Sequence, residues 1–177
     1  EIHERLVGSE MCIRDRYKCL RELNCDFSAF LSSKHERIKL QKYSYLIEKI
    51  FGLGVGRYSL YLNGPYNSTL ADELYSVAHN ESNYKKIMDE HPLGENSRQA
   101  LARIRNCFQS DNIDEVDLLE LYTTYDYLRK YYPSYSDSDI YDKLCKEKHH
   151  LIERYQSLNI KEMLCAIDTR INQLIAG

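Results

Sequence analysis

The chain has 177 residues, with 24 Lys and Arg against 27 Asp and Glu and a formal net charge of −3. This near-neutral balance argues against a protein that holds nucleic acid by bulk charge, although it leaves local basic patches open. The length suits one domain with a sizeable core, and no apolar run approaches the roughly 20 residues needed to cross a bilayer.

The first sixteen residues, EIHERLVGSEMCIRDR, resemble the in-frame translation of a sequencing-library adapter. The run VGSEMCIRD at 7–15 matches the translated end of a transposase adapter. We therefore interpret residues 1–16 as an artefact outside the fold and residues 17–177 as one helical domain. On this interpretation the natural start of the protein, together with any targeting segment, precedes this sequence.

Residues 35–51, HERIKLQKYSYLIEKIF, predict an amphipathic helix. Apolar side chains recur there at three- and four-residue steps from Leu40 to Ile50, which gives the helix a broad face for burial. Ser33 offers the starting cap, and Glu36 stands three residues later, as in a capping box.

A short β element follows this helix. GLGVG at 52–56 predicts a loop, and RYSLYL at 57–62 alternates as a strand does. Such a strand needs a partner for its backbone groups, and the sequence leaves open whether that partner is an irregular segment or a wing-like hairpin. Gly64 and Pro65 predict a sharp reversal, since glycine accepts a positive φ and proline fixes its own.

Apolar periodicity predicts further helices downstream. Asn67, Ser68 or Thr69 can cap the first of them. The predicted helices cover residues 69–79, 81–90, 96–109, 113–132, 136–150 and 159–175. The predicted fold class is therefore mostly α, a compact multi-helix bundle with one small β element near 57–62.

The cysteine and histidine pattern predicts neither disulfides nor a metal site. The five cysteines beyond residue 16 are scattered and contain no C-x-x-C pair, which is typical of reduced thiols in a cytosolic protein. His149 and His150 are adjacent, so they point to different sides of a helix rather than to one metal ion. We expect no metal and no cofactor.

The stretch ERIKLQKYSYLIEKIFGLGVGRYSLYLNGPYNSTLADELY, residues 36–75, resembles the YwgA-like group of small bacterial and archaeal proteins. The shared pattern is R-x-K-L-Q-K followed by Y-L-x-G-P-Y, with Asn67 where that group usually has Ser. A looser likeness links the chain to the Panacea (SocA-like) antitoxin domain. These resemblances imply a winged-helix-related module that binds a partner in a regulatory, antitoxin or defence setting, with no enzyme activity.

The segment around the Gly-Pro pair is the first candidate partner-binding site, formed by Tyr61, Gly64, Pro65 and Tyr66. The helix that follows offers free N–H groups to an anionic partner, and the two tyrosines would stack nearby. The competing interpretation is purely structural: the pair turns the chain and Tyr66 packs over the helix predicted at 35–51.

A second candidate partner-binding surface is rich in tyrosine. Seven of the sixteen tyrosines lie between Tyr122 and Tyr141, and Tyr127, Tyr131 and Tyr135 are the side chains that we expect to reach a partner. Tyrosine supplies a large contact area at a low entropic cost.

The alternative function is nucleic-acid binding by a winged-helix-type regulator. Two predicted helices carry the basic residues that would contact phosphate: Arg37, Lys39, Lys42, Arg98, Arg103 and Arg105. The competing interpretation is that these are solvated helix faces, in which interspersed glutamates dilute the positive charge.

No pattern of residues indicates catalysis, because no nucleophile motif and no clustered acid–base pair is present. The sequence thus predicts a non-catalytic, cytoplasmic regulatory module, antitoxin-like or defence-associated, that binds a protein partner and spans no membrane.

Overall fold

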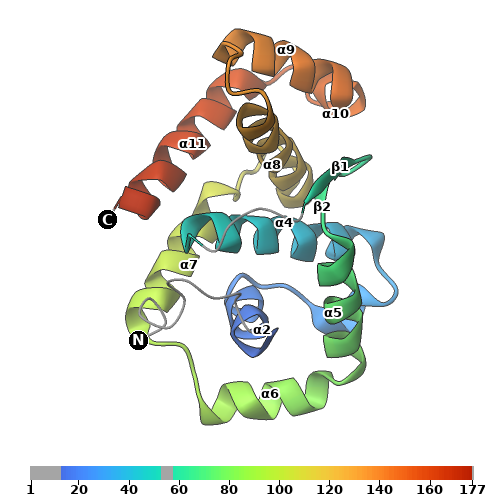
Figure 1. The fold of residues 1–177 in the computed structure, drawn as a ribbon, viewed down its shortest axis with the longest axis vertical. Coiled ribbons are helices and arrows are strands. Elements are labelled where there is room, and N and C mark those ends of the chain that lie inside the picture. The colour runs from blue at the N-terminus through green and yellow to red at the C-terminus, as the bar shows by residue number, and fades with distance from the viewer. Residues whose placement is uncertain (1–12, 53–57, 177) are drawn as a thin grey trace.

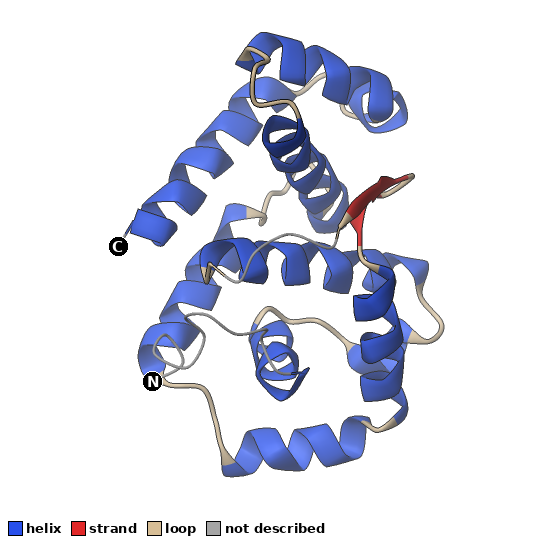
Figure 2. Cartoon of the chain, viewed as in Figure 1, coloured by secondary structure: helices blue, strands red, loops and turns tan. Residues whose placement is uncertain are grey.

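The computed structural model describes residues 13–52 and 58–176, which form ten helices and one two-stranded hairpin (Figure 1). The helices are α2 (Ile13–Glu22), α3 (Phe27–Phe30), α4 (Lys34–Ile50), α5 (Ser68–His79), α6 (Glu81–Glu90), α7 (Glu95–Cys107), α8 (Glu115–Tyr131), α9 (Asp137–Glu147), α10 (His149–Arg154) and α11 (Ile160–Ala176). The strands are β1 (Ser59–Tyr61) and β2 (Gly64–Tyr66). The predicted fold class, mostly helical with one small β element, is confirmed (Figure 2).

Helices α4 and α8 pack against each other at the centre of the molecule. Helices α9, α10 and α11 lie on one side of this pair, whereas α2, α3, α5 and α6 lie on the other (Figure 1). Helix α2 packs on α4, α6 and α7, and the hairpin packs on both α4 and α8. One cluster of buried apolar side chains runs through these contacts from Tyr17 to Ile171.

Short polar side chains fix where the main helices begin. Ser33 accepts a hydrogen bond from the backbone N–H of Glu36 at the start of α4. Asn67 caps α5 through the N–H of Leu70, and Asp114 caps α8. These caps satisfy N–H groups that have no partner inside the helix, so the predicted starts of α4 and α5 are correct to within a residue.

Six of the sixteen tyrosines are buried in the core. Tyr17, Tyr43, Tyr45 and Tyr122 are each at most 1% exposed. A buried phenol usually finds a hydrogen-bond partner. The Tyr43 hydroxyl donates to a carboxylate oxygen of Glu115 at 2.5 Å, whereas the buried Tyr17 hydroxyl has no partner among the described residues. Burial also raises the pKa of Tyr43, so this phenol stays protonated and acts as a donor in the core.

The hairpin corrects one prediction about the Gly-Pro pair. The reversal lies at 62–63, while Gly64 and Pro65 belong to β2, where Gly64 pairs with Tyr61 in an antiparallel register. The predicted positive φ of Gly64 is confirmed at +84°. The open choice of strand partner is thus resolved as a hairpin, whereas residues 53–57 of the predicted loop and strand lie outside the described residues.

Two further differences concern helix boundaries. The helix predicted at 136–150 is divided, because Lys148 has a non-helical backbone (φ −122°, ψ 30°) between α9 and α10. The boundary proposed after Arg16 falls inside α2, where Arg16 is buried and its guanidinium lies 2.6 Å from Glu48. Residues 1–12 lie outside the described residues, and the adapter origin of 1–16 stays a prediction.

Candidate functional site

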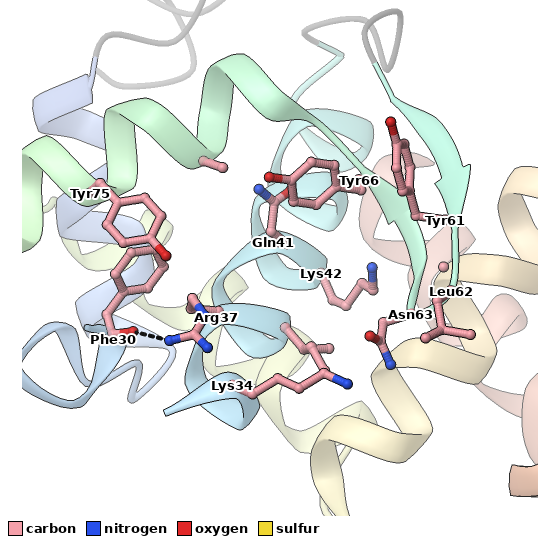
Figure 3. Close-up of a pocket in the computed structure, with 13 residues that line it drawn as sticks. Phe30, Lys34, Arg37, Gln41, Lys42, Tyr61, Leu62, Asn63, Tyr66 and Tyr75 are labelled. Atoms are coloured by element: carbon pink, nitrogen blue, oxygen red, sulfur yellow. Dashed lines mark hydrogen bonds between the residues drawn. The ribbon is translucent and has the colours of Figure 1, made fainter. Parts of the chain in front are cut away.

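A groove of about 410 Å³ lies between the hairpin, α4 and α5 (Figure 3). Its floor is a stripe of α4 formed by Lys34, Arg37, Ile38 and Gln41. These residues are three or four positions apart and therefore share one helix face. The opposite face of α4 faces the core, so this one helix supplies both core and groove.

Two side chains of α4 hold the backbone on either side of Tyr66. The Gln41 amide donates to the carbonyl of Asn67 at 3.0 Å and accepts from its N–H at 3.2 Å, as a neighbouring strand would. The Lys42 ammonium donates to the carbonyl of Pro65 at 2.6 Å. Lys42 of the L-Q-K motif thus binds Pro65 of the G-P-Y motif, 23 residues later, and Gln41 binds the following Asn67, 26 residues later.

Gly64 allows β2 to approach α8 closely. A Cβ atom at Gly64 would lie 2.5 Å from the Thr124 hydroxyl oxygen and 3.4 Å from Cε of Lys42. No side chain fits in that space. The glycine is needed there for its positive φ and for this contact.

A buried ion pair holds the tip of the hairpin. Lys148 and Glu120 lie 2.8 Å apart, with side chains only 1% and 4% exposed. Lys148 also donates to the carbonyl of Leu62, and the Asn63 amide donates to Glu120 at 3.0 Å. The break between α9 and α10 thus places Lys148 where it binds the turn.

Both members of this ion pair act electrostatically on Lys42. Lys42 is 2% exposed, and burial, together with the charge of Lys148, lowers its pKa to about 7 although Glu120 acts in the opposite direction. An ammonium group without a paired carboxylate is costly to bury. The groove therefore has a cation at its base whose charge is only partly balanced.

Aromatic side chains form the walls of the groove. Tyr61 and Tyr66 lie with ring centroids 5.2 Å apart, and Phe30 and Tyr75 meet edge to face at 4.9 Å (Figure 3). Leu62, at the turn, is 76% exposed. Among the described residues, no Asp or Glu lines this groove, so its chemistry is aromatic, apolar and cationic.

The structure separates the predicted partner-binding residues into two places. Tyr61, Gly64 and Tyr66 line the groove, and Pro65 lies buried behind them in β2. Gly64 and Pro65 are buried, whereas Tyr61 is 63% exposed beside them, and a partner contact at this segment stays a prediction.

The other three tyrosines form a separate patch at the end of α8. Tyr127 and Tyr131 stack with centroids 6.1 Å apart, and Tyr132 bridges Tyr131 to Tyr135. Tyr131 and Tyr135 are 66% and 49% exposed, and none of these residues lines the groove. The second candidate surface is therefore not part of the groove.

The basic residues of α4 are engaged inside the protein. Lys39 is 8% exposed and lies 2.8 Å from Glu115, while Lys42 is bound to Pro65. Arg37 donates through one guanidinium nitrogen to two carbonyls at the end of α3. Of these three side chains, Arg37 is the one that is not buried, and it lines the groove (Figure 3).

The basic residues of α7 lie elsewhere. Arg98 pairs with Glu95 of the same helix at 2.6 Å. Arg103 lines a small separate cavity of about 300 Å³ together with Arg170, and Arg105 is half-buried. The six predicted phosphate contacts thus do not form one surface.

A second cavity of about 560 Å³ is lined by charged residues from α4, α8 and α11. Lys49 and Asp126 lie 2.5 Å apart, and Asp126 also accepts from the Tyr45 hydroxyl at 2.7 Å. Arg129 and Asp168 lie 2.6 Å apart. These groups satisfy one another, so the network joins three helices rather than presenting a free acid or base.

Sequence reasoning missed several groove residues, among them Phe30, Lys34, Leu62 and Tyr75. The three- and four-residue spacing of Lys34, Arg37 and Gln41 was a signal available in the sequence. Phe30 and Tyr75 carried no such signal, because they meet only when α3 packs on α5.

Comparison with protein-family models, with curated proteins and with solved structures gives no match. The resemblance of residues 36–75 to the YwgA-like group and to the Panacea domain stays a prediction. Within the described ranges, no helix is both long and apolar enough to cross a membrane. In the same part of the chain, no three His, Cys, Asp or Glu side chains are grouped to hold a metal ion.

Proposed function

We propose that this protein is a non-catalytic interaction module that binds a protein partner through the groove between the hairpin, α4 and α5. One observation carries the proposal: Tyr61 and Leu62 are 63% and 76% exposed at the tip of a hairpin that is itself held by buried side chains. Large apolar side chains on an ordered support resemble the anchors of protein interfaces.

The way the hairpin is held supports this role. Its backbone carbonyls at Leu62 and Pro65 and the backbone of Asn67 bind to Lys148, Lys42 and Gln41 respectively. A surface that is ordered before binding loses less conformational entropy on association. The contacts therefore favour a preformed binding platform.

The polar groups of the second cavity have partners within the protein. Lys49, Asp126, Arg129 and Asp168 pair with one another across three helices. They stabilise the packing of the helices, so the groove beside the hairpin is the surface that we propose for binding.

The motif at 36–75 supports a regulatory setting. Within it, Lys42 of L-Q-K contacts Pro65 of G-P-Y and Gln41 contacts the next residue, Asn67, so the motif encodes the supported hairpin. By the resemblance, we propose an antitoxin-like or defence-associated regulator that acts in the cytoplasm.

The nucleic-acid alternative has less support from the geometry. Lys39, Lys42 and Arg98 are engaged by Glu115, Pro65 and Glu95. A binder that depends on phosphate contacts needs several accessible cations on one surface. A salt-dependent shift in the electrophoretic mobility of DNA on addition of the purified chain would favour this alternative.

Two tyrosines provide a matched test of the proposed surface. Tyr61 and Tyr131 are 63% and 66% exposed, but only Tyr61 lines the groove. The binding partner to try is the product of the neighbouring open reading frame, with affinity measured by calorimetry. We expect Tyr61→Ala to weaken binding by about tenfold or more and Tyr131→Ala to leave it unchanged; the reverse result would transfer the function to the tyrosine patch on α8.

A further inference from the structure

The groove has a charge bias that the rest of the chain lacks. Acidic residues outnumber basic ones in the sequence, 27 to 24. The described groove lining nevertheless contains Lys34, Arg37 and Lys42 and no carboxylate. Two acidic groups act on lining residues without belonging to the lining: Glu120 accepts a hydrogen bond from the Asn63 amide, and the charge of Asp72 acts on Tyr66.

Each of the three cations has bonding capacity left. Lys34 is exposed and makes no hydrogen bond or ion pair with any described residue. Arg37 uses a single guanidinium nitrogen for the two carbonyls at the end of α3. Lys42, at the base, has one hydrogen bond, to Pro65, and no carboxylate within ion-pair distance.

Cations and apolar groups face each other across the groove. Figure 3 shows Lys34 and Arg37 along the α4 edge, and Tyr61 and Tyr66 along the hairpin edge. A volume of about 410 Å³ lies within the range of sites that take a drug-sized ligand or a few side chains. The occupant therefore needs an apolar part for one edge and a negative charge for the other.

We infer that the groove binds a short acidic peptide segment of the partner, in which an aromatic or aliphatic residue lies next to one or more Asp or Glu side chains. The inference rests on the proposed function and specifies the chemistry of the partner segment that the groove binds. The apolar residue packs on Tyr61, Leu62 and Tyr66. The carboxylate pairs with Lys34 and the free end of Arg37, which lie about 5–6 Å apart at Cβ as i, i+3 neighbours.

Charge complementarity favours a peptide over a polynucleotide. A nucleic acid would need cations along a path several phosphates long, whereas the groove has three cations at one place and the basic residues of α7 lie apart. A carboxylate beside an apolar side chain matches that local arrangement.

A displayed library of random peptides tests the inference without knowledge of the natural partner. The full chain is used for selection, and peptides that still bind the Tyr61→Ala variant are removed. We expect the selected peptides to be enriched in Asp or Glu next to an aromatic or aliphatic residue. Their affinity, measured by fluorescence anisotropy, should fall as salt rises.

Charge reversal at two exposed lysines provides the control. Lys34→Glu changes the groove, whereas Lys146→Glu changes the net charge equally on exposed α9. We expect Lys34→Glu to weaken the selected peptides about five- to tenfold and Lys146→Glu to have no effect. Urea unfolding of both variants verifies that they remain folded.

The outcomes separate this inference from the proposed function. The selected peptides could need Tyr61 but lack acidic residues, or they could respond equally to both charge reversals. Either result refutes the inference of an acidic segment and leaves the groove as the binding site. A library that gives no Tyr61-dependent peptide overturns both. Displacement of the peptide by an oligonucleotide, or a dimer that Leu62→Asp dissociates, would make nucleic acid or a second copy the occupant instead.

Discussion

Replacing Gly64 by alanine tests the close approach of the hairpin to α8. A Cβ atom there would lie 2.5 Å from the hydroxyl oxygen of Thr124. That hydroxyl donates to the carbonyl of Glu120 at 2.7 Å, so it cannot turn away without losing a buried hydrogen bond. The substitution therefore combines an unfavourable φ of +84° with a steric overlap.

The backbone strain and the steric overlap each lower the free energy of unfolding by a known order of magnitude. A left-handed conformation costs a residue with a Cβ atom about 1–2 kcal/mol, and overpacking of a well-packed interior costs about 1–3 kcal/mol. Gly64→Ala should therefore lower the free energy of unfolding by about 2–5 kcal/mol. Gly52 provides the matched control, since it has a φ of +69° but nothing within 4 Å of its Cβ position.

Urea unfolding followed by circular dichroism measures both substitutions. We expect Gly52→Ala to lose only the conformational part, about 1–2 kcal/mol, and Thr124→Ala to relieve most of the additional loss in Gly64→Ala. The entropy of the unfolded chain changes equally in both glycine variants and cancels. Equal losses at Gly52 and Gly64, or strict additivity with Thr124→Ala, would refute the close contact.

Three further predictions concern buried polar groups and thiols. The pKa of Lys42 is lowered to about 7, so above that pH the folded state has released a proton that the unfolded state still holds. The stability of the wild type relative to Lys42→Met should therefore rise by about 1.4 kcal/mol per pH unit from pH 7 towards 9. A stability difference that stays constant with pH in urea titrations would contradict the buried charge. Glu120→Gln leaves Lys148 without its carboxylate and should cost about 3–5 kcal/mol of unfolding free energy; a loss below about 1 kcal/mol would show that the pair contributes little. Burial raises the pKa of Cys25 well above its ordinary value, whereas Cys165 is exposed. Iodoacetamide should therefore label Cys165 first in the native state. Equal labelling rates of the two thiols, measured by peptide mass spectrometry, would contradict the burial of Cys25.

Local patterns accounted for most of the secondary structure. The periodicity of α4, α8 and α11 and the caps at Ser33 and Asn67 are short-range features, which a sequence displays directly. Helix α2 is amphipathic too, with Tyr17, Cys19 and Leu20 buried, but it was not predicted, and part of it had been excluded with residues 1–16. The break at Lys148 was also hidden, because it is coupled to a contact with Leu62 that is 86 residues distant.

The candidate site was only partly readable. Tyr61 and Tyr66 were identified as contacts and line the groove, whereas the tyrosines of α8, predicted as a second surface, do not line it. Lys39 and Lys42 looked like surface cations, because charged side chains are rarely buried. Their burial depends on Glu115 and on the backbone of Pro65, far away in sequence.

The sequence by itself determined that this chain is mostly helical, where its main helices begin and that Gly64 takes a positive φ, because these properties depend on neighbouring residues. Only the tertiary structure decided that L-Q-K holds G-P-Y, that Lys148 and Glu120 hold the turn, and that three cations and several aromatic rings meet in one groove. Such contacts join residues 23 to 86 positions apart. Their formation depends on how the helices pack, which no local pattern encodes.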